Sequence, residues 1–219
     1  MPQITNISPQ KRNADFYNIE VDGRFLCGLG SIEVSSQGLK VGSMLTADDI
    51  ARLMAESLQA KAYNLALRYL SYRPRSEYEL REYLLRKDYT DEVVEGVVIR
   101  LSEAKFLDDE AFAQSWVRSR QASKPRSKRA LSVELAKKRV PKDIIDSVLA
   151  DVDSTDELLA LSQVAAKKLK LTRYSNDKQK LTQYLMGQGY KYSDVRRVLE
   201  ELATHDDEAD YGSDNGKPH

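Results

Sequence analysis

Cysteine and histidine are almost absent from this sequence of 219 residues, which holds the single cysteine Cys27 and the two histidines His205 and His219. A lone cysteine excludes an internal disulfide, and three scattered ligands are too few for a structural zinc site. A chain of this length can bury roughly 70% of the surface that its unfolded state exposes, so it does not need such support. We therefore expect no metal and no other cofactor.

Long apolar runs are missing as well. No stretch reaches the roughly 18 apolar residues of a membrane helix, and the first residues lack the apolar core of a signal peptide. The composition, with 41% hydrophobic residues, is that of a globular protein. These features predict a cytoplasmic protein.

An excess of either charge is also absent, because 34 Lys and Arg residues balance 34 Asp and Glu residues, yet the two signs are segregated. Residues 112–142 hold ten basic residues against the single acid Glu134, a local charge of +9. Residues 200–219 hold seven acids against Lys217, a local charge of −6. Helical spacing of apolar residues predicts that the basic stretch is folded. The end of the chain lacks such a pattern, so we expect a disordered acidic tail.

The first 45 residues predict a small β unit. The segment DFYNIEV alternates polar and apolar residues, Asp22 and Gly23 supply a turn that accepts positive φ, and RFLCGL continues as a second strand. GSIEV and QGLKVG then read as further short strands or a loop. Thr46 and Asp49 match a capping box that opens a helix. From there, helix is expected to about residue 203.

An internal repeat is the most informative feature of the sequence. SEYELREYLLRKDYTDEVVEGVV, from residue 76, aligns without a gap with SKRALSVELAKKRVPKDIIDSVL at an offset of 51. A further offset of 50 brings in DKQKLTQYLMGQGYKYSDVRRVL. The apolar positions coincide, as Leu80, Leu131 and Leu181 illustrate. Unrelated helices would rarely keep this register.

Each unit is predicted to contain three helices. Proline interrupts the first two units at equivalent positions, 74 and 125, and a serine cap follows each break. In the third unit we expect Ser154 and Ser193 as caps and a loop over 172–176. A period of 50 to 51 is too long for the 34-residue tetratricopeptide unit and indicates a short array, a type of structure that binds other macromolecules.

The sequence therefore predicts a mainly α fold, in which a small N-terminal β-hairpin unit precedes a tandem array of three three-helix repeats. The expected parts are 1–45 for the β unit, 46–105 for a capped helix and the first repeat, 106–152 for the second repeat, 153–203 for the third, and 204–219 for the disordered acidic tail.

No constellation of catalytic residues is present. Both histidines lie in the expected tail, which leaves serine and cysteine without a base, and no phosphate loop of the Gly-x4-Gly-Lys-Ser/Thr kind occurs. Acids such as Glu77, Glu79 and Asp108 lie at helix starts, where they stabilise the helix. We expect a protein that is not an enzyme, with an undetected hydrolase site as the remote alternative.

The twelve tyrosines invite a role in stacking on nucleic-acid bases, but packing is the simpler interpretation. Tyr89 and Tyr190 occupy a repeated position that holds Val140 in the second repeat, which indicates a contact between helices. We likewise expect Trp116 in a core and Cys27 as a small buried side chain.

The start of the second helix differs between the first two repeats. Ser76 is followed by Glu77 and Glu79, so the cap and the acids agree with the helix dipole. Ser127 is instead surrounded by cations at 126, 128 and 129, with Ala130 where a capping box has its acid. Such cations with unpaired amides predict an anion site, and the alternative is a solvated surface. Their charge fits DNA phosphates and an acidic protein partner equally well.

The chain resembles the RecX family, regulators of the bacterial recombinase RecA. The resemblance rests on ALRYLSYRPRSEYELREYLLRKDY, FLDDEAFAQSWVRSRQASKPRSKRALSVELAKKRV and KLTQYLMGQGYKYSDVRRVLEEL in the repeats and on FYNIEVDGRF in the leader, and it covers residues 3–203. Members are built of tandem three-helix units and bind along the groove of the RecA–DNA filament. They suppress its ATPase, strand-exchange and coprotease activities in recombination, DNA repair and the SOS response.

This resemblance implies a non-enzymatic, monomeric modulator of RecA filaments that binds through electrostatic contacts. The alternative is a stand-alone nucleic-acid-binding protein that acts without a recombinase. The residues expected to contact the filament or DNA are Arg75, Arg126, Lys128, Arg129, Lys137, Lys138, Arg139, Lys167, Lys168, Lys170, Arg173, Lys178 and Lys180.

Overall fold

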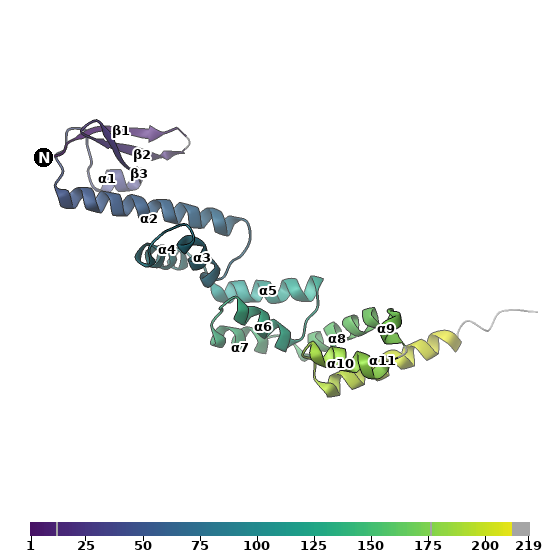
Figure 1. Cartoon of the computed structure of the whole chain (residues 1–219). Helices are drawn as coiled ribbons and strands as arrows, with labels where there is room; N and C mark the ends of the chain where they lie inside the picture. Colours follow the sequence, from purple (N-terminus) through teal and green to yellow (C-terminus); the bar gives the residue numbers. More distant parts are fainter. Residues whose placement is uncertain (12, 176, 212–219) are drawn as a thin grey trace, which may run out of the picture. The chain divides into compact units, whose positions relative to one another are not determined.

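The computed structural model describes residues 1–11, 13–175 and 177–211. The chain divides into two compact units, residues 1–107 and residues 108–219. The first unit holds a small sheet and the first repeat, and the second unit holds the second and third repeats (Figure 1). The mainly α fold with three three-helix repeats behind an N-terminal sheet is confirmed.

Three antiparallel strands open the first unit, in the order β1-β2-β3. They are β1 (Ile4–Gln10), β2 (Asn13–Val21) and β3 (Arg24–Gly30). The predicted hairpin is confirmed, because Val21 of β2 pairs with Arg24 of β3 across a tight turn. Asp22 and Gly23 in that turn have φ values of 49° and 75°, a region that glycine enters without steric cost.

Two elements of this unit differ from the prediction. The polar segment ITNISPQ forms the strand β1, because Ile4 is completely buried and Ile7 pairs with Ile19 of β2. The segment after β3 forms the short helix α1 (Ser31–Ser36) instead of the expected strand or loop. In this helix Val34 packs against the sheet core while Ile32 is 78% exposed, so the two residues do not share a face as they would in a strand.

The long helix α2 (Ala47–Ser71) belongs to both the sheet and the first repeat. Its capping box is confirmed, since the Asp49 N–H donates to Thr46 Oγ1 and the Asp49 carboxylate accepts the Thr46 N–H. Leu53, in its first half, lies in the core under the sheet. Ala62 and Ala66, in its second half, lie in the core of the first repeat. The capped helix and the first helix of the repeat are therefore one continuous element.

The remaining helices complete the three repeats. The first repeat continues with α3 (Glu77–Leu85) and α4 (Asp91–Glu103). The second consists of α5 (Asp109–Ser123), α6 (Lys128–Lys137) and α7 (Lys142–Ala150), and the third of α8 (Ser154–Leu169), α9 (Thr172–Ser175), α10 (Lys178–Gly187) and α11 (Tyr192–Tyr211). Each repeat has its own hydrophobic core, and Leu80, Leu131 and Leu181 are at most 1% exposed. The register of the repeat is thus confirmed by packing.

The third repeat departs from the expected boundaries. Asp153, and not Ser154, caps α8, because its carboxylate accepts the Thr155 N–H at 3.0 Å and a charged acceptor suits a helix start. Ser193 is the second residue of α11 rather than its cap. The expected loop contains the short helix α9. At its far end α11 continues to residue 211, into the expected tail, and residues 212–219 lie outside the described part of the chain.

A residue with left-handed backbone follows α3, α6 and α10, which are equivalent helices of the three repeats. Asp88, Arg139 and Gly189 hold this equivalent position, with φ values of 62°, 57° and 93°. Such a residue is common after a helix because it lets the chain turn away. Gly189 has no room for a side chain, since a Cβ there would lie 2.6 Å from Ser127 Oγ and 3.0 Å from the Arg129 Cβ. The third repeat therefore packs its turn directly against the start of α6.

Candidate functional site

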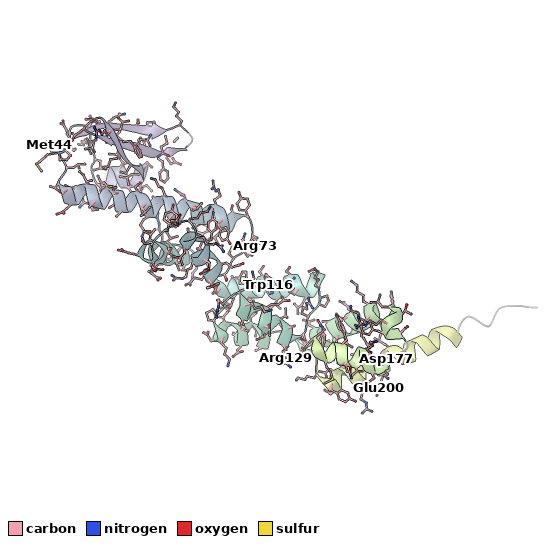
Figure 2. The ribbon with its side chains drawn as sticks, in the orientation of Figure 1. Met44, Arg73, Trp116, Arg129, Asp177 and Glu200 are labelled. Atoms are coloured by element: carbon pink, nitrogen blue, oxygen red, sulfur yellow. The ribbon has the colours of Figure 1, made fainter. Side chains whose placement is uncertain are left out.

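The cations predicted to contact the filament or DNA have two kinds of surroundings. Arg75 lies in the first unit, and the others lie in the second. Those with exposed side chains, which we call the basic surface, are Arg129, Lys137, Arg139, Lys167, Lys170, Arg173, Lys178 and Lys180. Those with partly buried side chains are Arg75, Arg126, Lys128, Lys138 and Lys168. Figure 2 marks Arg129 in the first turn of α6 and Asp177 at the start of α10.

The start of α6 is closed by the chain itself. Ser127 caps the helix as predicted, because its Oγ accepts the Ala130 N–H at 3.1 Å, and the hydroxyl donates to Gln188 O at 2.7 Å. The Lys128 N–H donates to Glu157 Oε1 of α8 at 2.9 Å. A carboxylate from the third repeat thus lies at a helix start that has Ala130 at the position of the capping-box acid, and it accepts the N–H of Lys128 rather than that of the cap residue. The expectation that these amides are unpaired is therefore wrong for Lys128 and Ala130, and the carboxylate of Glu157 already lies at the helix start.

Arg126 takes part in the same contact between repeats. Its Nη1 donates to Gln188 Oε1 at 3.0 Å, and its Nε lies 3.7 Å from Glu134 Oε1. The contacts of Arg126, Ser127 and Lys128 with Glu157, Gln188 and Gly189 form what we call the repeat junction. Sequence reasoning does not find this junction, because its partners are 29 to 62 positions apart and lie in different repeats.

Arg75 in the first repeat is equivalent to Arg126 in the second. It packs beside two residues that contact each other, and the equivalent two residues of the second repeat also contact each other. In the first repeat the pair is Tyr69 and Tyr83, whose rings stack at 3.9 Å, and the Arg75 guanidinium lies 4.1 Å from the Tyr69 ring centre. In the second repeat the pair is Arg120 and Glu134, which form an ion pair at 2.7 Å. An ion pair thus replaces an aromatic stack, and the one acid of the basic stretch is used inside its own repeat.

Trp116 is expected to lie in a core, but it is only partly buried at the edge of one. It packs against the core of the second repeat, and its Nε1 donates to Glu134 Oε2 at 2.9 Å. The Arg120 guanidinium lies 4.5 Å from the ring centre and Lys138 Nζ lies 5.4 Å from it. Lys138 therefore extends along an aromatic surface, as expected for a long cation at the edge of a core.

Two buried side chains behave as the sequence predicts. Tyr190 is 5% exposed and Cys27 is 2% exposed. Burial raises the pKa of the Cys27 thiol to about 11, so the reactive thiolate is scarce at neutral pH. Among the described residues, no group of three or more His, Cys, Asp or Glu side chains could hold a metal ion. None of the described helices has both the length and the apolar character needed to cross a membrane.

Sequence reasoning also misses a cavity of about 340 Å³ between the second and third repeats. Lys124, Arg126, Lys167 and Lys168 line it, together with Tyr190. One signal was available in the repeat alignment, because Tyr190 brings a hydroxyl group to a buried position that valine fills in the second repeat. The alignment indicates the position but does not show that four cations gather around it.

Models of the RecX family match most of the helical part of this chain. The first, second and third three-helix domains of RecX match residues 62–101, 108–149 and 155–199, more than half of the chain. The regulatory protein RecX of Halalkalibacterium halodurans is 34% identical over 87% of this chain and 74% of that protein. The regulatory protein RecX of Clostridium perfringens is 29% identical over 94% of this chain and 99% of that protein.

Solved structures agree with these matches. A crystal structure of a regulatory protein RecX superimposes with a TM-score of 0.79 at 27% identity, covering 91% of this chain and all of the other. The crystal structure of RecX from Lactobacillus salivarius shares the fold, with a TM-score of 0.61 over 67% of this chain and 97% of the other. On the strength of all three domain matches and these relatives, the chain belongs to the RecX family of regulatory proteins.

Proposed function

We propose that the protein is a non-enzymatic, monomeric and cytoplasmic regulator that binds the RecA–DNA filament and inhibits its ATPase, strand-exchange and coprotease activities. Membership in the RecX family supports a regulatory role. The observation that carries the binding mode is the basic surface of the second unit, whose eight cations are exposed while Glu134 is engaged with Arg120 and Trp116.

In this proposal the basic surface meets DNA phosphates or acidic side chains of RecA. Exposed lysine and arginine side chains release counterions when they contact phosphates, which makes binding dependent on salt. The partly buried cations are assigned mainly to positioning. Arg126 joins two repeats, and Arg75 stacks on Tyr69.

Titration of the full chain into RecA assembled on single-stranded DNA tests the proposal. We expect the ATPase rate of RecA to fall in a saturable manner, and the affinity for the RecA-coated strand to exceed that for the bare strand at physiological salt. The protein alone should hydrolyse no ATP above the rate in buffer. Equal affinity for bare and coated strands would contradict the proposal and favour the stand-alone nucleic-acid-binding protein.

A pair of matched variants assigns the contact surface. Arg129→Gln with Lys137→Gln removes two charges from the basic surface, and Lys40→Gln with Lys61→Gln removes two exposed charges from the first unit. The first pair should weaken filament binding and reduce the slope of log affinity against log salt by about one unit per lost phosphate contact. The second pair should leave both values unchanged. Equal weakening by the two pairs would show that net charge, and not this surface, governs binding.

A further inference from the structure

The cavity beside the repeat junction has the dimensions of a ligand site. The end of α5 and the start of α6 line one side, and α8, α10 and Tyr190 line the other. Its volume of about 340 Å³ falls within the range of roughly 300–1,000 Å³ that is typical of small-molecule sites. The cavity lies inside one compact unit, so its walls are positioned by the contacts described above.

The charge of the lining favours an anion. Lys124, Arg126, Lys167 and Lys168 all contribute to it, and none of the lining residues that the structure describes is acidic. Cations that converge on one space repel each other, and an anion placed between them relieves that repulsion. The nearby carboxylate of Glu157 is already used by the Lys128 N–H.

Two buried polar atoms of the lining have no hydrogen-bond partner among the described residues, the Tyr190 hydroxyl and the Arg126 Nε. The Arg126 Nε lies 3.7 Å from Glu134 Oε1, a distance that allows charge attraction but is too long for a hydrogen bond. A buried polar group without a partner destabilises the fold and is uncommon in folded proteins, so these two groups require an explanation. Burial, and then the charge of Glu157, raises the pKa of Tyr190 to about 12. The hydroxyl therefore keeps its proton at neutral pH, so both groups are donors.

We propose that this cavity binds a phosphate group. Lys124 and Lys168 supply positive charge, while the Arg126 Nε–H and the Tyr190 hydroxyl donate to phosphate oxygens. The four side chains come from three places in the fold, the connection between α5 and α6, the helix α8 and the residues after α10. The tetrahedral oxygens of a phosphate can accept from several directions, whereas a carboxylate accepts in one plane. Tyr184 also lines the cavity and has Lys168 Nζ 4.8 Å from its ring centre, so this ring holds the Lys168 cation beside the cavity.

Such a phosphate has two possible sources, a free nucleotide or the backbone of DNA. Titration of the full chain with inorganic phosphate, with adenosine monophosphate and with a single-stranded oligodeoxythymidine, each followed by calorimetry, separates them. Binding of phosphate and the mononucleotide without the oligonucleotide identifies a small ligand. Oligonucleotide binding that depends on Tyr190 identifies the DNA backbone. Either result supports the site, and neither requires RecA, so it stands or fails separately from the proposed regulation.

Two variants with matched controls make the test specific. Tyr190→Phe removes only the hydroxyl and should weaken phosphate binding by about tenfold or more, as expected for a hydrogen bond to a charged group. The same change should not lower the melting temperature without ligand, because it removes an unpaired buried group. Lys168→Gln should weaken binding to a similar extent. The controls Tyr192→Phe and Lys40→Gln alter exposed residues outside both the cavity and the basic surface and should have no effect.

Two outcomes would overturn the proposal. One is that none of the three probes binds. The other is that a probe binds but Tyr190→Phe and Lys168→Gln leave its affinity as high as the controls do.

Discussion

Gly189 illustrates how much a single residue decides at the contact between repeats. Its φ of 93° is one that residues with a Cβ rarely adopt, and it faces the start of α6. The equivalent residues, Asp88 and Arg139, take left-handed backbone without being glycine. The special requirement at Gly189 therefore comes from the closeness of Ser127 and Arg129, in addition to its backbone angle.

Replacing Gly189 by alanine should destabilise the second unit. Left-handed backbone costs an L-residue about 1–2 kcal/mol. The new Cβ would also lie only 2.6 Å from Ser127 Oγ, so the serine side chain would have to move. We expect the free energy of unfolding in urea to fall by at least that amount. Gly187→Ala is the matched control, because nothing lies within 4 Å of its Cβ position and alanine favours helix by about 0.5–1 kcal/mol. Equal stability of the two variants would show that the close packing at Gly189 is not maintained in solution.

At the same scale, the sequence predicts the role of a residue more readily than its partner. Ser127 is predicted as a cap from its position before a helix, and Tyr190 is predicted as a packing residue from its place in the repeat. Both predictions are confirmed. Ser127 donates to Gln188 O, and Tyr190 lines the cavity. Both contacts depend on how the second and third repeats pack together, which no local sequence pattern predicts.

Among the helices, α6 has a start that depends on another helix. Sequence comparison with Glu77 and Glu79 would favour an acid at position 128, because acids stabilise a first turn. The structure reverses this expectation, since Glu157 already accepts the Lys128 N–H and a second carboxylate would repel it.

Lys128→Glu should therefore lower the free energy of unfolding, by about 0.5–1 kcal/mol for like charges at a helix start. Lys128→Gln controls for loss of the cation alone. Combining Lys128→Glu with Glu157→Gln should recover part of the loss, because the repulsion is removed. Urea denaturation of the unchanged protein, of Lys128→Glu, of Glu157→Gln and of the double variant measures this coupling. Strictly additive effects would mean that the two side chains do not interact.

The start of α2 provides a pH-dependent contribution to stability. The pKa of the Asp49 carboxyl is held below its ordinary value of 3.8, first by the Thr46 N–H and then by the Thr46 hydroxyl. Because the folded pKa is the lower one, ionised Asp49 stabilises the fold above pH 3.8, and this contribution is lost as the pH falls through the folded pKa.

Asp49→Asn should remove this contribution. The difference in unfolding free energy between the two proteins should be constant near neutral pH and should shrink below pH 3.8. Urea unfolding at a series of pH values measures it. A difference that persists unchanged in acid would indicate that the hydrogen bonds at Thr46 do not depend on the ionised carboxylate.

For the whole molecule, residues 204–219 are expected to be dispensable for folding. Among the residues of α11 whose side chains the structure describes, Leu202 is the last that packs against the core of the third repeat. Truncation after residue 203 should change the free energy of unfolding by less than about 0.5 kcal/mol. The deleted segment holds five acids and one lysine, a charge of −4, so the net charge rises from zero to +4. Binding to anionic partners should then strengthen slightly at low salt, whereas a large loss of stability would show that the segment is docked.

The whole fold is predictable to the extent that it is periodic. The coincidence of Leu80, Leu131 and Leu181 across three repeats predicts their burial, which the structure confirms. Less regular parts are not predicted, such as β1, whose polar residues give no alternation, and α1, whose apolar residues alternate like a strand. The cavity is likewise not predicted, because it depends on how two repeats pack within one unit and not on the sequence of either repeat.

Because α2 runs without interruption from the sheet into the first repeat, the order in which a ribosome releases the chain matters for this protein. The sheet and the first half of α2 can assemble once residue 53 has emerged, since Leu53 completes their core. The second half of the same helix then waits with Ala62 and Ala66 uncovered until α3 and α4 follow. During that interval the nascent chain presents an apolar helix face anchored to a finished sheet, which is a surface that a ribosome-associated chaperone can hold.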